Sequence, residues 1–165
     1  MTEQTKPLTM QGLTAMATEV GTEAGPGATT REFNRRLIDE FRANAGVLHG
    51  ELGQANFVLL TTTSAKDGGP RTTPLVYHRI DGRLIVIAST GGGPRNPAWF
   101  DNLVADPVVT VEIGAQAWKS RARVLSGADR DAVFAAVVAS VPTFGGYQAR
   151  TSRVIPVIEL LPQGS

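Results

Sequence analysis

The residues best suited to chemistry lie in two short segments that contain glycine. The first begins with Thr61–Ser64, four successive hydroxyl side chains, and continues through Lys66 and two glycines to Arg71. Hydroxyls, backbone N–H groups and a Lys/Arg pair are the donors that a phosphate or carboxylate needs in a turn. The same residues also fit an ordinary charged hairpin tip, so this segment alone leaves two interpretations open.

The second segment runs from Ala88 to Pro97 and contains Gly91, Gly92 and Gly93. Glycines allow a planar ligand to lie against the backbone without meeting a side chain. A helix is expected to begin just after this segment, and the first turn of a helix offers free N–H groups to an anion. The alternative is a flexible connection between a strand and a helix.

Several other kinds of catalytic site lack their residues here. The chain has no cysteine and only two histidines, His49 and His78, so it has neither thiolate ligands nor a multi-histidine metal centre, and we predict no metal. The patterns of a P-loop, a Gly-x-Ser-x-Gly elbow and a His-Glu-x-x-His zinc site are absent. The Gly91–Pro94 run lacks the spacing of a dinucleotide fingerprint, and nothing points to a Ser-His-Asp triad.

The elements that must position these segments are mainly strands. Apolar and β-branched runs predict strands at 57–63, 71–79, 83–89, 108–113, 117–125 and 154–160. Helical spacing predicts helices at 31–45, 97–105 and 129–141. Asp81-Gly82 is a strong hairpin turn, and strands joined by tight turns pair antiparallel. We therefore expect a small antiparallel β-barrel of six strands with flanking short helices.

Length and charge bound the function further. The 165 residues suit one domain, and 16 Lys+Arg against 15 Asp+Glu argue against a nucleic-acid binder. Residues 1–30 lack Phe, Tyr, Trp and Ile and are expected to form a flexible arm, with residues 31–165 as the folded domain. No stretch has the pattern of a signal peptide or of a membrane span, which predicts a cytoplasmic protein.

The helix predicted at 31–45 carries several arginines off its apolar stripe. They are Arg31, Arg35, Arg36 and Arg42. A solvated helix face is the plain interpretation. The other is weak association with an anionic membrane surface, which would make the protein peripheral to a membrane.

Residues 56–161 resemble the deazaflavin (coenzyme F-420)-dependent nitroreductase family of actinobacteria, the split β-barrel flavin/deazaflavin oxidoreductases. The resemblance is carried by five motifs in order: Leu59–Leu75, Leu84–Gly92, Asn96–Leu103, Ala105–Pro107, and Tyr147-Gln148 with Arg153–Val157. It implies an FMN-binding split-barrel fold, mainly β with some helix. It also implies coenzyme F-420, an 8-hydroxy-5-deazaflavin with a phosphate and a polyglutamate tail.

The resemblance also implies where the cofactor binds. In the family, the turn matching Lys66 to Arg71 binds the anionic tail, the segment matching Ile87 to Gly92 lies along the ring, and Pro74 to Val76 wall the ring in. The cofactor-binding residues that we expect are Thr61, Thr62, Thr63, Lys66, Arg71, Thr73, Pro74, Leu75, Val76, Ile87, Ala88, Ser89, Thr90, Gly91, Gly92, Pro97, Trp99 and Asn102. For Trp99 the alternative is core packing, and for Asn102 it is bracing of a neighbouring loop.

The activity implied is hydride transfer from reduced F-420 to a quinone, an enone or other conjugated carbonyl, or a nitro compound. As catalytic residues we expect Tyr147, a proton donor or hydrogen-bond anchor, and Ser89, a second polar contact near the ring. For Tyr147 the alternative is packing. The chain departs from the family at Thr90, where many relatives carry Lys, at Asp67, and in a thin aromatic wall of Phe144 and Tyr147.

Other functions remain open at this stage. An FMN-dependent split-barrel oxidoreductase is the nearest alternative enzyme. A non-catalytic module that binds a cofactor for storage or sensing is another. The oligomer expected is a monomer or a homodimer.

Overall fold

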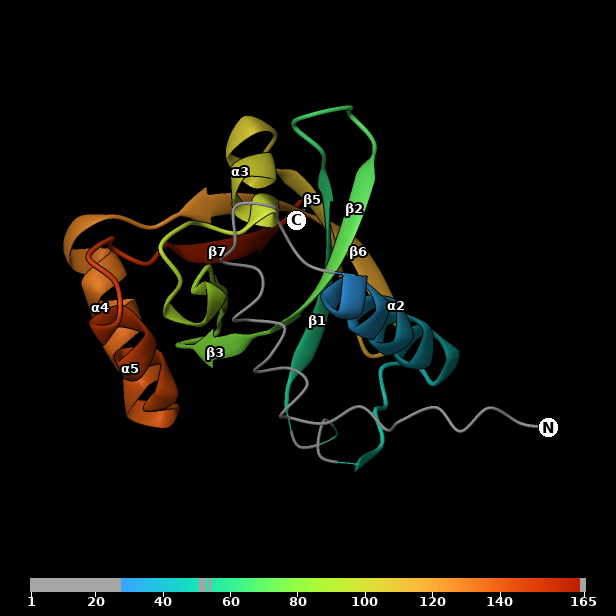
Figure 1. Cartoon of the computed structure of the whole chain (residues 1–165), viewed down its shortest axis with the longest axis horizontal. Coiled ribbons are helices and arrows are strands. Elements are labelled where there is room, and N and C mark those ends of the chain that lie inside the picture. The colour runs from blue at the N-terminus through green and yellow to red at the C-terminus, as the bar shows by residue number, and fades with distance from the viewer. Residues whose placement is uncertain (1–27, 51–52, 54, 164–165) are drawn as a thin grey trace.

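The structure is a computed structural model that describes residues 28–50, 53 and 55–163. Within these ranges, seven strands form one antiparallel sheet in the order β2-β1-β5-β6-β7-β4-β3 (Figure 1). The strands are β1 (Phe57–Thr63), β2 (Pro70–Val76), β3 (His78–Ile80), β4 (Arg83–Ile87), β5 (Val108–Ile113), β6 (Gln116–Val124) and β7 (Val157–Pro162). The fold is a split barrel with flanking helices, as the sequence predicts.

The sheet curls on itself because the chain changes partner strands at Tyr77. β2 and β3 lie at opposite ends of the strand order, yet Tyr77 alone separates them in the chain. The Tyr77 N–H donates to the carbonyl of Asn56 (2.9 Å), after which the chain leaves β1 and pairs with β4 instead. A sheet whose two edge strands are consecutive in sequence must bend until those edges approach each other.

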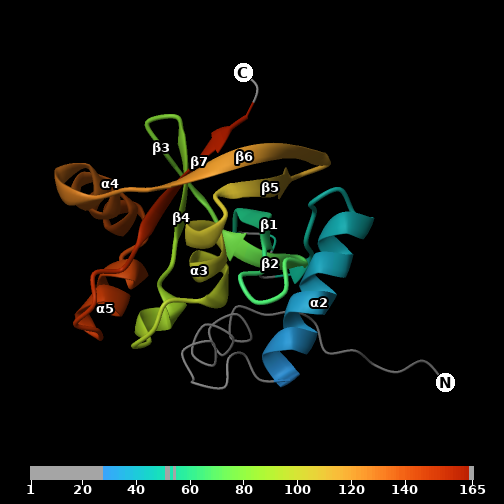
Figure 2. The ribbon, with the colours of Figure 1, turned by 90° about the horizontal axis from the view of Figure 1, so that it is seen from above.

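The helices cover the sheet in three places. They are α2 (Ala28–Ala43), α3 (Ala98–Ala105), α4 (Gly127–Ser140) and α5 (Thr143–Ala149), with a short 3-10 turn, η2 (Thr90–Gly92). Figure 2 shows α2 at one end of the molecule, α4 and α5 at the other, and α3 between them.

Side-chain alternation along the strands produces three apolar clusters. Val58 and Leu60 of β1 face the barrel interior, where Trp99 and Leu103 of α3 pack with them. The alternate residues of β1 face outward and pack against Leu37 and Phe41 of α2. On β4, Ile85 and Ile87 likewise face outward, toward α4 and α5. Adjacent residues of one strand therefore serve opposite faces of the sheet.

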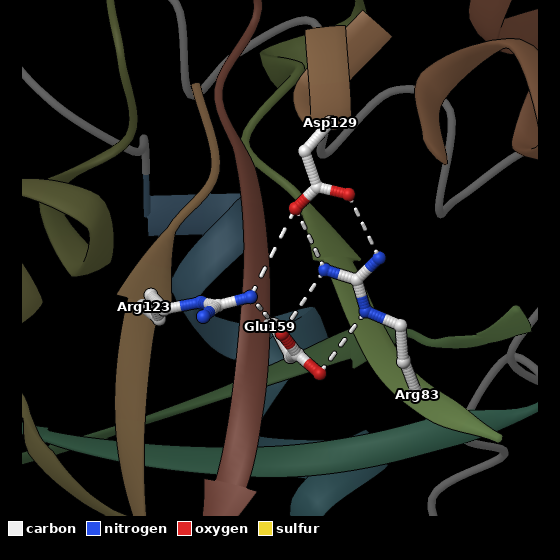
Figure 3. A network of polar contacts seen from close by, with 4 residues as sticks. All are labelled: Arg83, Arg123, Asp129 and Glu159. Carbon is white, nitrogen blue, oxygen red and sulfur yellow. Dashed lines mark hydrogen bonds and ion pairs between the residues drawn. The ribbon is translucent and has the colours of Figure 1, made fainter. Parts of the chain in front are cut away.

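Beside the cluster in which β4 packs against α4 and α5, a charge network joins β4, β6, β7 and α4 (Figure 3). The Glu159 carboxylate is buried and accepts hydrogen bonds from Arg83 (3.1 Å, twice) and Arg123 (2.9 Å). Arg83 also donates twice to Asp129 at 3.0 Å, near the start of α4. The bonds from Arg83 lower the pKa of Asp129 and raise that of Arg83. The network thus connects the start of α4 to three strands of the sheet.

The structure corrects four details of the predicted elements. The predicted strand 71–79 is two strands, because the chain changes partner at Tyr77, so the barrel has seven strands rather than six. Helix α5 was not predicted, and β7 covers Val157–Pro162 rather than 154–160. The helix expected to begin near Arg31 begins at Ala28, so residues 28–30 of the predicted arm are helical. The rest of that arm lies outside the described residues.

The Asp81-Gly82 hairpin turn is confirmed. It joins β3 to β4, and both residues have positive φ angles, 52° at Asp81 and 78° at Gly82. Positive φ at both central residues is the requirement of a type I′ turn, which Asp-Gly meets readily.

Candidate functional site

The hydroxyl groups at the end of β1 are largely engaged within the protein. The Thr61 hydroxyl pairs with that of Thr72 across the β1–β2 ladder (2.8 Å). The Thr62 hydroxyl is buried and accepts a hydrogen bond from the Asn102 side chain (3.2 Å). The half-buried Thr63 hydroxyl has no hydrogen-bond partner among the described residues.

The β1–β2 turn also uses most of its own backbone N–H groups. Five of them donate internally: Ser64 to the Gly69 carbonyl (2.8 Å), Ala65 to the Asn102 side chain (3.0 Å), Lys66 to the Ser64 hydroxyl (3.1 Å), Gly68 to the Ser64 carbonyl (2.9 Å) and Gly69 to the Asp67 carboxylate (2.9 Å). The expectation that this turn presents free backbone donors is therefore wrong for these five groups. Anion binding here depends on side chains.

Two cations remain for that role. Lys66 is exposed, and its ammonium group has no partner among the residues that the structure describes. The Arg71 guanidinium is half exposed and forms an ion pair with Asp67, four residues earlier. The hydrogen bonds from Gly69 and from Arg71 lower the pKa of Asp67, which stays ionised. An anionic ligand would meet Lys66 directly and would compete with Asp67 for Arg71.

The strand register separates the predicted wall Pro74 to Val76. Leu75 is opposite Val58, and it packs against the interior cluster. Val76 is opposite Phe57 and packs on the outer face, against the cluster that includes Leu37 and Phe41 of α2. Pro74 is opposite Leu59 and lies on that same outer face. Thr73, opposite Leu60, shares the interior face with Leu75. These residues do not wall one surface together.

Three other predicted residues are buried in packing positions. Trp99 is 6% exposed and belongs to the interior cluster, which favours core packing over ligand contact. Asn102 is 8% exposed and braces both β1 and the β1–β2 turn through the bonds described above. Pro97 is buried directly before α3. They shape the site rather than line an open surface.

The glycine-rich segment after β4 is organised by an arginine that the sequence analysis did not name as a site residue. The Arg153 guanidinium donates to the carbonyls of Ala88 (3.2 Å), Ser89 (2.8 Å) and Gly93 (3.0 Å). It also donates to the Thr90 hydroxyl (2.9 Å). Burial lowers the pKa of Arg153, but an arginine stays protonated in a protein.

The same segment leaves its donors open. The N–H groups of Ser89, Thr90 and Gly91 have no hydrogen-bond acceptor in the described part of the chain. Ser89 is right-handed (φ −83°), whereas Thr90 (φ 46°) and Gly91 (φ 63°) are left-handed. A right-handed residue followed by a left-handed one directs successive N–H groups into one concavity. In this segment, which we call the 88–93 loop, three N–H groups thus have no acceptor, while the carbonyls of Ala88, Ser89, Thr90 and Gly93 accept hydrogen bonds.

Helix α5 lies against this loop and carries Tyr147. A Cβ on Gly92 would lie 2.8 Å from the Tyr147 carbonyl, so the backbones approach closely. The Tyr147 ring packs edge-on against Phe144 (5.4 Å between centroids), which packs edge-on against His78 (5.1 Å). Tyr147 is half-buried, and its hydroxyl has no partner among the described residues. The structure thus brings Tyr147 beside the loop that contains Ser89.

His78 lies beneath α5 and is 8% exposed. Its Nε2 atom is buried without a hydrogen-bond partner, and burial lowers the pKa of the imidazole. The uncharged ring is therefore the form present at neutral pH.

Two further surfaces lie away from these residues. A cavity of about 310 Å³ lies between the end of α2 and the β5–β6 turn, where Arg42 binds Glu112 (2.8 Å). That ion pair accounts for one of the arginines considered for a membrane surface. In the described ranges, no helix is long and apolar enough to cross a bilayer, and no group of three His, Asp or Glu residues gathers as metal ligands.

The sequence profile of one family, F420H(2)-dependent quinone reductase, matches residues 33–162. The chain belongs to this family. A family relative, an F420H(2)-dependent quinone reductase of Mycobacterium tuberculosis, is 36% identical over 120 residues, which span 71% of this chain and 80% of the relative. The resemblance drawn from the motifs is thereby confirmed, and with it an oxidoreductase that uses reduced F-420.

Solved structures agree with this membership. One described as an F420-H2 dependent reductase, FDR-A, is 37% identical with a TM-score of 0.58, and the match covers 64% of this chain and 93% of that one. Another, described as a domain-swapped dimer, is 33% identical with a TM-score of 0.61, covering 79% and 95%. A heme storage protein of Vibrio cholerae (15% identical, TM-score 0.52, covering 78% and 89%) shares the fold alone.

Proposed function

We propose that this chain binds reduced F-420 with the ring against the 88–93 loop and the anionic tail at the β1–β2 turn. The acceptor, a quinone or another electron-poor carbonyl or nitro compound, lies over the exposed face of that ring, near Tyr147 of helix α5. When bound, the reduced deazaflavin supplies a hydride. The residues of this chain orient the two reactants, exclude water and deliver a proton.

The observation that carries the proposal is the 88–93 loop. Arg153 occupies three of its carbonyls, and the N–H groups of Ser89, Thr90 and Gly91 are open. A surface of open donors fits the acceptor-rich edge of a deazaflavin ring. Gly91 has no side chain to hold the ring away, and Ser89 is small.

The tail site rests on the exposed Lys66 and on Arg71. A phosphate and several carboxylates bind well where two cations flank one turn. Because both cations are exposed to solvent, their contribution is a screened surface interaction, and it falls as salt is added. Thr63, with its open hydroxyl at the end of β1, is an additional side-chain donor close to the turn in sequence.

Tyr147 is the group on this chain best placed to act on the acceptor. Its ring is held by Phe144 and its hydroxyl is open, so the hydroxyl can donate to the oxygen that gains negative charge. Ser89 is a second polar group on the facing loop. The remaining aromatic surface is small, which suits a range of flat acceptors.

The primary test is a fluorescence titration of the purified chain with F-420, with FMN in a parallel titration. We expect F-420 to bind and FMN to bind much more weakly, because FMN lacks the polyglutamate tail. Turnover of reduced F-420 with menadione then separates an enzyme from a module that only binds the cofactor. Tight binding of FMN without binding of F-420 would overturn the proposal.

Tyr147→Phe tests the role of Tyr147, because it removes the hydroxyl and keeps the packing of the ring against Phe144. We expect kcat with menadione to fall by about 100-fold, the lower end of the usual contribution of a general acid. Tyr77→Phe is the matched control, since it removes the only other tyrosine hydroxyl in the chain. Full turnover by Tyr147→Phe would remove Tyr147 from the mechanism.

A further inference from the structure

Arg153 makes five hydrogen bonds to a loop that lies about 60 residues earlier in the chain. Besides the three carbonyls and the Thr90 hydroxyl, its guanidinium donates to the Asn96 side chain (2.7 Å). A planar guanidinium presents five N–H donors in a fixed fork, so it sets the directions of all its acceptors together. A flexible ammonium group cannot do this.

The consequence for the 88–93 loop follows from peptide geometry. The carbonyls of Ala88, Ser89 and Gly93 turn toward Arg153. Thr90 adopts a left-handed backbone, which is uncommon for a threonine and persists only where surrounding contacts enforce it. Its hydroxyl supplies such contacts, because it accepts from Arg153 and lies within hydrogen-bond distance of the carbonyls of Ser89 (2.7 Å) and Arg95 (2.9 Å).

A second set of contacts connects Arg153 to helix α5. The Gln148 side chain donates to the Arg153 carbonyl (2.7 Å) and accepts from the Ile155 N–H (3.0 Å). It also accepts from Arg130 (3.1 Å), which is itself buried and donates to the Ile155 carbonyl (2.8 Å). Gln148 directly follows Tyr147, so these bonds hold the helix that carries the proposed proton donor.

We propose that Arg153 and Gln148 are positioning residues for the two halves of the site. Arg153 builds the donor surface of the 88–93 loop before the cofactor binds. Gln148 ties helix α5, and with it Tyr147, to the segment that follows. The proposal rests on the proposed function, because it assigns the loop to the cofactor and α5 to the acceptor.

The two roles predict different measurements. In Arg153→Gln the loop adopts its binding conformation in a smaller fraction of molecules, and the apparent Kd rises in inverse proportion to that fraction. We expect the Kd for F-420 to rise by about tenfold or more, with kcat at saturating cofactor changing by less than about threefold. In Gln148→Met the Kd for F-420 changes little, whereas kcat falls and KM for menadione rises.

A readout without any ligand accompanies the kinetics. Hydrogen–deuterium exchange of the free protein should show faster exchange at Gly92 and Gly93 in Arg153→Gln, since their N–H groups bond within the loop. Exchange in β5 and β6 should be unchanged. Arg153→Lys keeps the charge without the forked geometry, so its Kd for F-420 and its exchange rates in the loop should lie between those of wild type and Arg153→Gln. Arg121→Gln, at an exposed position of β6, is the control for loss of an arginine.

The outcomes separate the inference from the proposed function. If the wild-type chain does not bind F-420, the proposed function fails, and the cofactor role of Arg153 fails with it. If the wild type binds and Arg153→Gln shows the same Kd and the same exchange in the loop, the inference alone is overturned. A lower melting temperature with an unchanged Kd would make Arg153 a purely structural residue, which also overturns it. If Arg153→Gln does not fold, Arg153→Lys decides between these outcomes.

Discussion

Asn102 connects the core helix α3 to the β1–β2 turn, and its removal tests how that turn is held. The Asn102 side chain is 8% exposed, accepts from the Ala65 N–H (3.0 Å) and donates to the Thr62 hydroxyl (3.2 Å). Asn102→Ala removes both bonds at once. Because Thr62 is 2% exposed, water cannot readily replace the lost donor at its hydroxyl.

The size of the effect follows from these two bonds. A neutral hydrogen bond within a protein contributes about 1 kcal/mol, and leaving a buried polar group unsatisfied costs about 1–3 kcal/mol. The Ala65 N–H lies in an exposed residue and can be hydrated, so only the Thr62 side incurs the larger cost. We expect Asn102→Ala to lower the free energy of unfolding by about 2–3 kcal/mol. For a chain of this size that lowers the melting temperature by roughly 5–10 °C.

Urea unfolding followed by circular dichroism measures this change, and Thr62→Val is the matched variant. Thr62→Val removes one of the two bonds, leaves the buried Asn102 amide without that acceptor, and should cost about 1–3 kcal/mol in the wild-type background. In the Asn102→Ala background it should cost less, because the bond is already absent. An Asn102→Ala protein within about 0.5 kcal/mol of wild type would refute the reasoning, as would full additivity of the two changes.

Three further predictions concern the turn, the loop and α5. Asp67→Asn keeps an acceptor for Gly69 but releases Arg71, so F-420 should bind about two- to fivefold more tightly at low salt, as expected for a surface ion pair. Gly92→Ala forces a methyl group to within 2.8 Å of the Tyr147 carbonyl at a φ of +84° and should lower stability by about 1–3 kcal/mol. Replacing His78 by Leu should reduce the loss of stability in acid, because burial lowers the pKa of His78 below its ordinary 6.5.

Each of these three has its own control. The comparison for Asp67→Asn is Lys66→Ala, which should bind F-420 more weakly than wild type. If Asp67→Asn and wild type bound F-420 equally well at low salt, Asp67 would not compete with the cofactor for Arg71. The control for Gly92→Ala is Gly146→Ala, because Gly146 is open to solvent at an ordinary φ. Gly82 is also exposed, but its φ is positive, so it would not separate strain from close contact. Melting temperatures that fall equally would contradict the close contact.

The sign of the His78 effect follows from proton uptake. The unfolded chain binds a proton on this histidine as pH falls through 6.5, whereas the folded chain binds it only at a lower pH. Stability is therefore greatest above pH 6.5 and falls with pH below that value. His78→Leu should flatten this part of the curve, and the exposed His49→Gln should leave it in place. Identical pH curves for wild type and His78→Leu would contradict the prediction.

Most of the fold was predictable because its signals are local. Phe57–Thr63 is apolar and β-branched over its whole length, and Asp81-Gly82 meets the requirement of a single turn type. The division of strand 71–79 was not, because nothing within that sequence interrupts an extended chain. The break arises at Tyr77 from a change of partner strand, which is a property of the whole sheet. Helix α5 contains Gly145 and Gly146, which disfavour helix, and packing on the outer face of the sheet outweighs that preference.

The structure brings together the segments of the candidate site that the sequence indicates, but it separates some of their residues. Motif spacing located the turn and the loop, but strand alternation decides which neighbouring residues share a surface, and it places Leu75 apart from Pro74 and Val76. Arg153 lay within a recognised motif, yet its contacts to the 88–93 loop join segments about 60 residues apart. Local propensity carries no information about such a contact. A positively charged residue in a short apolar segment before a buried strand was the available signal.

Under the proposed function, the turn and the loop bind the cofactor by different means, which accounts for a nearly neutral chain holding a polyanionic cofactor. The turn contributes two exposed cations, one of them shared with Asp67, so its attraction is modest and sensitive to salt. The loop contributes backbone donors whose directions are fixed by Arg153 from behind, at a partly buried position where screening is weaker. Under this proposal a formal net charge of +1 is sufficient, because the loop orients the ring and only the tail is bound by charge. We therefore expect the proposed site to distinguish F-420 from FMN through the tail and both from other anions through the loop.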